Sequence, residues 1–146
     1  CRILVHDILD LTDYCAKHDI LPVSLDELLS QSDVVTLHLP LDATTRGIIN
    51  KDRLSLLQPN SVLINAARGG LVDESALLEV LRGGRLSGAG LDVFADEPPQ
   101  NRDLLELPNV MVTPHIGGST EEAVLNMGRA AIRGLEHFSD PRDVTG

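Results

Sequence analysis

The segment Ser61-Val-Leu-Ile-Asn-Ala-Ala-Arg-Gly-Gly-Leu-Val-Asp73 decides the fold class of this chain. Its apolar start predicts a buried strand over 61–65. Asp73 is of a residue type that caps helices, and the apolar residues after it share one side of a predicted helix that ends at Gly83-Gly84. A strand that passes through a short loop into an amphipathic helix predicts a βαβ unit and a parallel sheet.

The same alternation of strands and helices continues on both sides of this segment. Further strands are expected over 2–6, 20–23, 34–39, 88–93 and 110–113. Ser24 and Glu27 have the spacing of a capping box, Asn50 can cap a helix, and residues 119–122 can cap a long helix that runs through Leu135. The polar tail 139–146 is expected to leave the domain. The chain is therefore predicted to be one α/β domain over 1–146.

The composition is that of an aliphatic globular protein with a large negative charge. Of its 146 residues, 42% are hydrophobic and 2% are aromatic, which suits a parallel sheet covered by helices. The 12 basic and 22 acidic residues give a net charge of −10, so neither nucleic acid nor an anionic membrane is expected as a partner. Cys1 and Cys15 form no metal motif and no disulfide framework. Together with the lack of a signal-peptide pattern, these reduced thiols predict a cytoplasmic protein.

Polar residues follow nearly every predicted strand. These strand ends are Asp7, Pro40, 65–68, Asp92 and 113–115. In an open parallel sheet, ligands bind beyond the carboxyl ends of the strands. We therefore expect the functional site at that rim, and no metal site.

Four sequence motifs carry a resemblance to a known family. They are Asn65-Ala-Ala-Arg-Gly-Gly-Leu-Val-Asp73, Gly90-Leu-Asp-Val-Phe-Ala-Asp-Glu-Pro98, Thr113-Pro-His-Ile-Gly-Gly118, and His38-Leu-Pro-Leu41 followed by Thr45. In their order and spacing they resemble the NAD-binding domain of the D-isomer-specific 2-hydroxyacid dehydrogenases, including the phosphoglycerate dehydrogenase-like enzymes. The resemblance implies a Rossmann-like, doubly wound parallel sheet, with a substrate domain built from segments outside this chain.

The motifs contain the groups that hydride transfer from a hydroxy acid requires. Arg68 can grip a carboxylate with two parallel hydrogen bonds, although a surface arginine in a salt bridge is the alternative. His115 is of the residue type that can accept and return a proton near neutrality. By resemblance, Glu97 hydrogen-bonds this imidazole and stabilises its charged form, while the neighbouring Asp96 is the competing acid. The other histidines, His6, His18, His38 and His137, are expected to be structural.

The resemblance also assigns contacts to the cofactor, NAD. Asp7 would accept hydrogen bonds from the adenosine ribose and would repel a 2′-phosphate, although an aspartate at a strand end can equally be a turn residue. Asp92 matches the contact to the nicotinamide carboxamide, and the backbone of Ala66 and Ala67 would line the ring. The matched motifs add further cofactor contacts, namely Leu39, Pro40, Thr45, Arg68, His115, Ile116, Gly117 and Gly118.

A glycine-rich phosphate loop is missing from the pattern. The loop and its strand are expected before Arg2, and Gly88-Ala-Gly90 leads into a strand instead of following one. That strand would lie in the middle of the sheet, so its neighbours should expose unpaired backbone groups. We therefore expect a fragment, or a chain completed by another polypeptide. By itself it should bind NAD poorly and turn over no substrate.

Three functions remain open at this stage. The first is an NAD-dependent dehydrogenase of a D-2-hydroxy acid, expected as a homodimer, with phosphoglycerate, glyoxylate or hydroxypyruvate, and lactate-type substrates all compatible. The second is a non-enzymatic NAD-sensing or interaction module on the same fold. The third is a relative of formate dehydrogenase, in which a Glu97–His115 pair would have no hydroxyl proton to remove.

Overall fold

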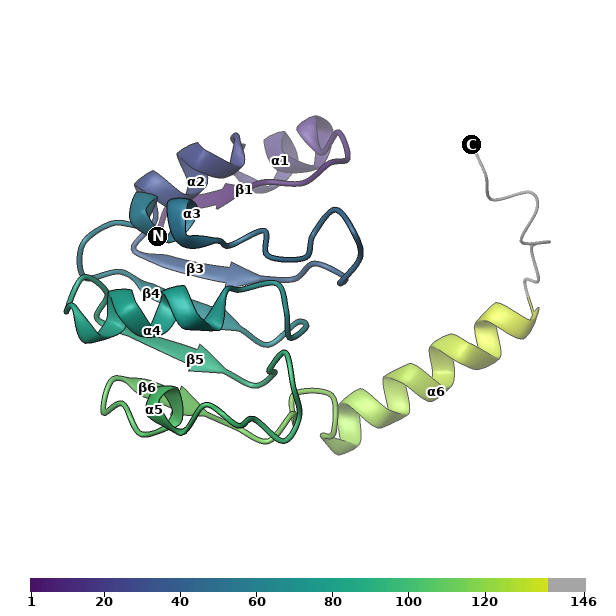
Figure 1. Cartoon of the computed structure of the whole chain (residues 1–146). Helices are drawn as coiled ribbons and strands as arrows, with labels where there is room; N and C mark the ends of the chain where they lie inside the picture. The colour runs from purple at the N-terminus through teal and green to yellow at the C-terminus, as the bar shows by residue number, and fades with distance from the viewer. Residues whose placement is uncertain (137–146) are drawn as a thin grey trace. The chain divides into compact units, whose positions relative to one another are not determined.

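The computed structural model describes residues 1–136, and the chain divides into two compact units, Cys1–Pro114 and His115–Gly146 (Figure 1). In chain order the elements are β1 (Ile3–Val5), α1 (Thr12–His18), β2 (Ile20–Pro22), α2 (Leu25–Gln31), β3 (Val34–Leu37), α3 (Lys51–Leu56), β4 (Val62–Asn65), α4 (Glu74–Arg82), β5 (Gly88–Leu91), α5 (Arg102–Leu105), β6 (Val110–Val112) and α6 (Glu121–Glu136). His137 and the tail 139–146 lie outside the described residues.

The larger sheet confirms the expected parallel architecture. Its strands lie in the order β3-β4-β5-β6, and each neighbouring pair is parallel, with Val34 opposite Val62 and Val62 opposite Gly88. Because all strands point the same way, their carboxyl ends meet at one rim. Asn65, Asp92 and Thr113 come at the ends of β4, β5 and β6 and share that rim.

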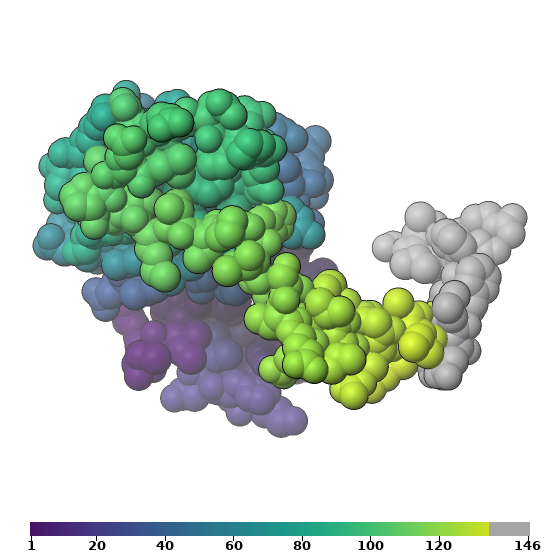
Figure 2. All heavy atoms as spheres, turned by 90° about the horizontal axis from the view of Figure 1, so that it is seen from below, coloured from purple at the N-terminus to yellow at the C-terminus, as the bar shows by residue number. Residues whose placement is uncertain are grey.

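One helical layer covers the larger sheet. Helices α2, α3, α4 and α5 form a row of contacting neighbours, and their buried leucines pack with those of the strands. The core contains Leu29, Val35, Leu37, Leu54, Leu63, Leu77, Leu81, Leu91 and Leu104. Figure 2 shows the residues of α5 and β6 (green) at the near side of this packed mass. On the opposite face, Val34, Thr36 and Met111 are exposed. Within Cys1–Pro114, helices therefore cover one face of this sheet, whereas a doubly wound sheet was expected to carry helices on both faces.

The expected single sheet is divided into two. Strands β1 and β2 pair in parallel as a separate two-stranded sheet, with Ile3 opposite Ile20. Among the described residues, no strand joins β1 to β3. The two pieces therefore keep separate hydrogen-bond ladders.

Local capping chemistry explains where most of the helices begin. Ser24 and Glu27 form the predicted reciprocal capping box, and the side chains of Asn50 and Asp73 each accept the capping hydrogen bond at their helices. At α6 the capping hydroxyl is that of Thr120, which accepts from Ala123 N at 3.1 Å. Helices α1 and α5 were not predicted. Both helices are short, and Leu11, the N-cap residue of α1, makes no side-chain capping hydrogen bond.

Candidate active site at the rim of the larger sheet

The loop after β4 is held by the side chain of the last strand residue. Asn65 is only 2% exposed, and its Nδ2 donates to the carbonyl oxygen of Arg68 at 3.0 Å, while its Oδ1 accepts from Ala67 N at 3.2 Å. One amide thus satisfies two backbone groups of the turn that it precedes. The turn directs the exposed Arg68 side chain away from the core.

The Arg68 side chain is exposed and is hydrogen-bonded to its own loop. Its Nη1 donates to the carbonyl oxygen of Ala67 at 2.6 Å, and within residues 1–136 it takes part in none of the salt bridges, which join Lys51 to Glu79, Arg53 to Asp26 and Arg82 to Asp103. The sequence left open that Arg68 is a surface arginine in a salt bridge. Among residues 1–136, the structure shows no salt bridge at Arg68.

The Arg68 loop presses against the loop that carries Glu97. A Cβ atom placed on Gly69 would lie 1.7 Å from the carbonyl oxygen of Phe94, so the two backbones are in direct contact. Glu74, in the first turn of α4, adds a second link by accepting from Ala95 N at 2.7 Å. The positions of Arg68 and Glu97 are consequently coupled through backbone contacts.

The Glu97 carboxylate is folded back onto its own loop. It is exposed, its Oε1 accepts from Phe94 N at 3.1 Å, and the peptide bond to Pro98 is cis. In this arrangement the carboxylate stabilises the turn that follows Asp92. Its neighbour Asp96 is exposed as well.

Asp92 links the ends of three strands. It is 8% exposed and accepts from Thr113 Oγ1 at 2.5 Å, while its backbone N–H donates to the carbonyl oxygen of Asn65 at 3.0 Å. A buried carboxylate needs such partners. Asp92 therefore holds the carboxyl ends of β4, β5 and β6 together at the rim.

A cavity of about 430 Å³ lies beside the Arg68 loop. It is lined by His38, Leu39, Pro40, Ala66, Ala67 and Arg68, so five of the expected site positions line one space. Thr45 shapes its wall, because its hydroxyl donates to the carbonyl oxygen of Pro40 at 2.7 Å and accepts from Asp42 N at 2.9 Å.

His38 is the residue of this cavity that the sequence analysis did not propose. It is exposed, and its Nε2 lies 3.2 Å from Thr36 Oγ1. It had been assigned a structural role, yet it lines the same cavity as Arg68. Its place at the start of the motif 38–41, just past the end of β3, was the available signal.

The loop opposite the Arg68 turn is ordered by a carboxylate. Asp42 Oδ1 accepts from Thr44 Oγ1 and Thr44 N, both at 2.7 Å, and from Thr45 N at 3.1 Å. The Thr44 hydroxyl, followed by the two backbone N–H groups, lowers the pKa of Asp42 below its ordinary value.

Asp7 acts as a turn residue in this structure. It is exposed just beyond β1, and its Oδ1 accepts from Leu9 N at 2.9 Å. This is the turn role that the sequence left open beside the ribose role. Because a carboxylate has acceptor positions for several partners, one bond to the backbone is compatible with a second ligand.

His115 belongs to the second unit, together with Ile116, Gly117 and Gly118. It is exposed and has a positive φ of 55°, and the carbonyl oxygen of Ile116 accepts from Ser119 N at 2.9 Å. A positive φ is uncommon for a residue other than glycine and marks a tight turn. The Arg68 and Glu97 loops thus meet within the first unit, whereas the His115 turn belongs to the second unit.

The described residues show neither a metal cluster nor a membrane span. Within 1–136, no group of three or more His, Cys, Asp or Glu side chains could hold a metal ion. Over the same residues, no helix has both the length and the apolar character to cross a bilayer. Cys15 is buried and Cys1 is exposed, and both are free thiols.

Comparison with known proteins identifies similar sequences. The family described as "D-isomer specific 2-hydroxyacid dehydrogenase, NAD binding domain" matches residues 1–117. The glycerate dehydrogenase of Methylorubrum extorquens is 44% identical over 119 residues, which are 80% of this chain and 38% of that protein. The D-3-phosphoglycerate dehydrogenase of Methanocaldococcus jannaschii is 50% identical over 99 residues, covering 68% of this chain and 19% of that protein.

The fold is matched by solved structures as well. The D-lactate dehydrogenase of Aquifex aeolicus, described as complexed with NAD and lactic acid, superposes with a TM-score of 0.82 and 35% identity over 94% of this chain. That match covers 46% of the other chain. The present chain therefore spans less than half the length of each of these relatives.

Proposed function

The chain belongs to the D-isomer-specific 2-hydroxyacid dehydrogenase family, and its matched part is the NAD-binding domain. From this premise we propose that it supplies the nicotinamide end of a site that transfers a hydride between NAD and a D-2-hydroxy acid and its 2-oxo acid. The chain then forms part of the NAD-binding domain, and the substrate domain is contributed by segments outside it.

The observation that carries the proposal is the turn held by Asn65. Its amide fixes Ala67 and Arg68 by two hydrogen bonds, and the exposed guanidinium of Arg68 stands at a cavity whose other walls are Leu39, Pro40 and Ala66. A guanidinium at such a position anchors a carboxylate and polarises the adjacent carbonyl group. The chain has a net charge of −10, so an anionic substrate needs a local positive charge to attract it, and the Arg68 guanidinium supplies one.

Proton transfer falls to His115, with Glu97 as its partner. In the oxidative direction the imidazole accepts the hydroxyl proton, while the hydride leaves C2 with its electron pair and the C–O bond becomes a carbonyl. Glu97 would then stabilise the imidazolium that results. Bound NAD⁺ supplies the acceptor for the hydride. The reverse reaction returns the same proton to the alkoxide oxygen.

The residues around the cavity suit a nicotinamide. Ala66 and Ala67 have small side chains that leave room for a flat ring, and the carboxylate of Asp92 can accept from a carboxamide N–H₂ at the same rim. Leu39 and Pro40 line the same cavity, and the Thr45 hydroxyl donates to the carbonyl oxygen of Pro40. Thr45 and the loop 116–118 add the remaining proposed contacts. Asp7 would select NAD over NADP by repelling a 2′-phosphate.

The first substrate to test is 3-phosphoglycerate with its 2-oxo counterpart. Relatives that are 46–50% identical to this chain are named D-3-phosphoglycerate dehydrogenases, beside relatives named glycerate dehydrogenase and glyoxylate reductase. We expect the active form to be a homodimer.

The decisive assay uses the longest natural polypeptide that contains this sequence. NADH oxidation is followed with phosphohydroxypyruvate, hydroxypyruvate, glyoxylate and pyruvate, alongside His115→Ala. Loss of a general acid–base should lower kcat about 10²- to 10⁴-fold while NADH binding is retained. The matched control is His18→Ala, because His18 packs on the Tyr14 ring, outside the proposed site, and should leave kcat unchanged.

Two results would contradict the proposal. NADH binding without turnover across the whole panel would favour the sensing module. Full activity in His115→Ala would remove the assigned proton carrier. The chain 1–146 by itself should give no turnover, and robust activity from it would show that no further segment is needed.

A further inference from the structure

The exposed stretch that carries Glu97 begins where the chain leaves the core. Val93 is 2% exposed and Phe94 is 7% exposed, whereas each residue from 95 to 98 is exposed. The Glu97 carboxylate accepts from Phe94 N, three residues back in the same loop. Such a bond fixes the local shape of the loop, but it does not fix where the loop lies relative to the rest of the domain.

A carboxylate from outside the loop holds its first exposed residue. Glu74 Oε1 accepts from Ala95 N at 2.7 Å, although 21 residues separate the two in the sequence. Glu74 is half-buried, and a hydrogen bond from a backbone N–H to a carboxylate is among the stronger hydrogen bonds in proteins. Ala95 is therefore tied to α4 at the point where burial no longer holds the chain.

Helix α4 is a rigid base for this carboxylate. Asp73 caps its first turn. Ala76, Leu77 and Leu81 of the same helix are buried in the core. Because the helix is packed into the core, the position of Glu74 is set by the body of the domain and not by the loop that it holds.

The peptide group between Phe94 and Ala95 is held at both of its polar ends. Its carbonyl oxygen abuts the backbone at Gly69, where a Cβ atom would collide with it. Its N–H donates to Glu74. A peptide group is planar, so contacts at the carbonyl and at the N–H together set its orientation. The residues that follow, including Glu97, therefore start in a fixed direction.

We propose that Glu74 is a positioning residue for proton transfer, because it fixes the direction in which the loop presents the Glu97 carboxylate. The proposal rests on the function proposed above, in which Glu97 stabilises the charged form of His115. Without Glu74, the exposed stretch 95–98 has more than one orientation open to it, and the carboxylate is in place for only part of the time. Glu74 does not line the cavity beside Arg68, so its loss should affect kcat and leave the KM of NADH unchanged.

Two substitutions at position 74 separate the hydrogen bond from the charge. Glu74→Gln keeps an acceptor oxygen at the same reach and loses the charge. Glu74→Asp keeps a charge near the N-terminus of α4 but is one methylene shorter, so it no longer reaches Ala95 N. Hydrogen exchange at the Ala95 amide should become faster by about tenfold or more in Glu74→Asp, and should stay within about threefold of the unaltered protein in Glu74→Gln.

The same two variants are assayed for turnover in the longest natural polypeptide that contains this sequence. With NADH and the panel of 2-oxo acids, Glu74→Asp should lower kcat about 10- to 10²-fold, because a misplaced Glu97 supports proton transfer poorly. Glu74→Gln should keep kcat within about threefold, because its neutral oxygen retains most of the bond to Ala95 N. The KM of NADH should be unchanged in both variants.

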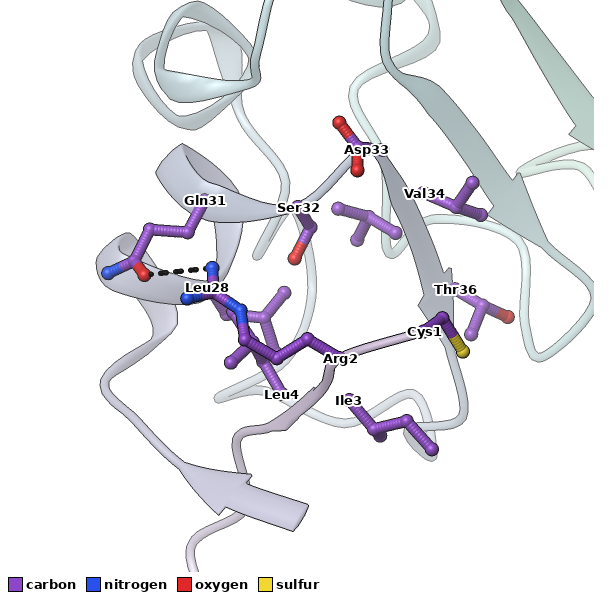
Figure 3. A pocket seen from close by; sticks show the side chains of 11 residues that line it. Cys1, Arg2, Ile3, Leu4, Leu28, Gln31, Ser32, Asp33, Val34 and Thr36 are labelled. Atoms are coloured by element: carbon purple, nitrogen blue, oxygen red, sulfur yellow. Dashed lines mark hydrogen bonds between the residues drawn. The ribbon is translucent and has the colours of Figure 1, made fainter. Parts of the chain in front are cut away.

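Two control variants remove side-chain contacts elsewhere. Glu79→Gln changes another carboxylate of α4, which pairs with Lys51 at 2.7 Å on the surface. Gln31→Ala removes a second long-range hydrogen bond, in which Arg2 Nη2 donates to Gln31 Oε1 at 3.3 Å beside a separate cavity of about 510 Å³ (Figure 3). None of the residues that line that cavity belongs to α4 or to the loop that it holds. Both controls should leave kcat and the exchange rate at Ala95 unchanged.

The possible failures of the proposal can be told apart. Equal kcat in Glu74→Asp and in the unaltered protein overturns the positioning role. A larger loss of kcat in Glu74→Gln than in Glu74→Asp assigns the effect to the charge at the helix N-terminus and overturns it as well. Unchanged exchange at Ala95 in Glu74→Asp shows that the carboxylate does not hold the loop, whether or not the protein turns over substrate. Absence of turnover in the unaltered polypeptide contradicts the proposed function itself, and the positioning role falls with it.

Discussion

Gly69 is the residue at which the two proposed site loops meet. A methyl group there would collide with the carbonyl oxygen of Phe94 at 1.7 Å and would also come within 2.7 Å of Ala95 N. Both colliding atoms are backbone, so the strain cannot be relieved by a side-chain rotation. Either the Arg68 turn or the Glu97 loop must move.

Gly69→Ala is therefore expected to destabilise the chain by about 1–3 kcal/mol, the usual cost of overpacking. In an assay of the proposed dehydrogenase activity, the displaced Arg68 should lower kcat/KM by about 10²-fold. Gly128→Ala is the control, because a Cβ atom there meets nothing within 4 Å. Urea unfolding measures the stability of both variants, and equal midpoints would contradict the predicted clash.

Asp42 predicts a pH response confined to the loop 40–45. The Thr44 hydroxyl and the backbone N–H groups of Thr44 and Thr45 hold its pKa below the ordinary 3.8. A carboxylate with a lowered pKa in the folded state contributes fully above its ordinary pKa, and this contribution is lost as the pH falls through the lowered value. The loop should therefore keep its order down to about pH 4 and lose it below.

NMR can follow this change at the amides of Thr44 and Thr45. Their chemical shifts should titrate below about pH 4. In Asp42→Asn this titration should disappear, since no ionisable group remains at position 42. Persistence of the same titration in Asp42→Asn would assign it to another carboxyl group.

Helix α4 shows how an element fixes a site that it does not contain. Asp73 Oδ1 accepts from Ala76 N at 3.0 Å, and the backbone N–H of Asp73 donates to the carbonyl oxygen of Ile49. The next residue, Glu74, accepts from Ala95 N of the Glu97 loop. The start of α4 is thereby hydrogen-bonded to two segments that flank the Arg68 loop, one at Ile49 and one at Ala95.

Asp73→Ala should cost about 0.5–2 kcal/mol, the value of a lost N-cap hydrogen bond. Asp73→Asn keeps the acceptor oxygen and should lose at most a few tenths of a kcal/mol, since asparagine caps as well as aspartate. Urea unfolding of the two variants measures the difference. Equal losses would mean that the carboxylate charge, and not the cap, stabilises the helix.

Helices that begin with a side-chain capping motif were predictable from the sequence, and a short helix without such a cap was not. The capping box Ser24–Glu27 begins α2 as expected, because both partners lie within one turn of the chain. Helix α1 was missed, since it buries only Cys15 among its residues and its N-cap residue, Leu11, makes no side-chain cap. The predicted strand 34–39 ends at Leu37, because the chain leaves the sheet before Pro40.

At the scale of the whole molecule, the difference from expectation is the division of the sheet. A continuous sheet was expected, and the structure has the pair β1-β2 separate from β3-β4-β5-β6. Strand periodicity is a local property and predicted the strands. Which strands pair depends on the presence of a neighbour with free backbone groups, and between β1 and β3 none is described.

The sequence by itself determined the family, the βαβ order and the residues that deserve testing, because these are properties of short motifs and their spacing. It also predicted Arg68, Glu97 and His115 as the reacting groups, and those roles remain predictions. Tertiary structure decided how loops far apart in sequence meet: Asn65 holding the Arg68 turn, Gly69 against Phe94, and His38 in the same cavity. Such contacts depend on packing between strands and loops that no single segment encodes.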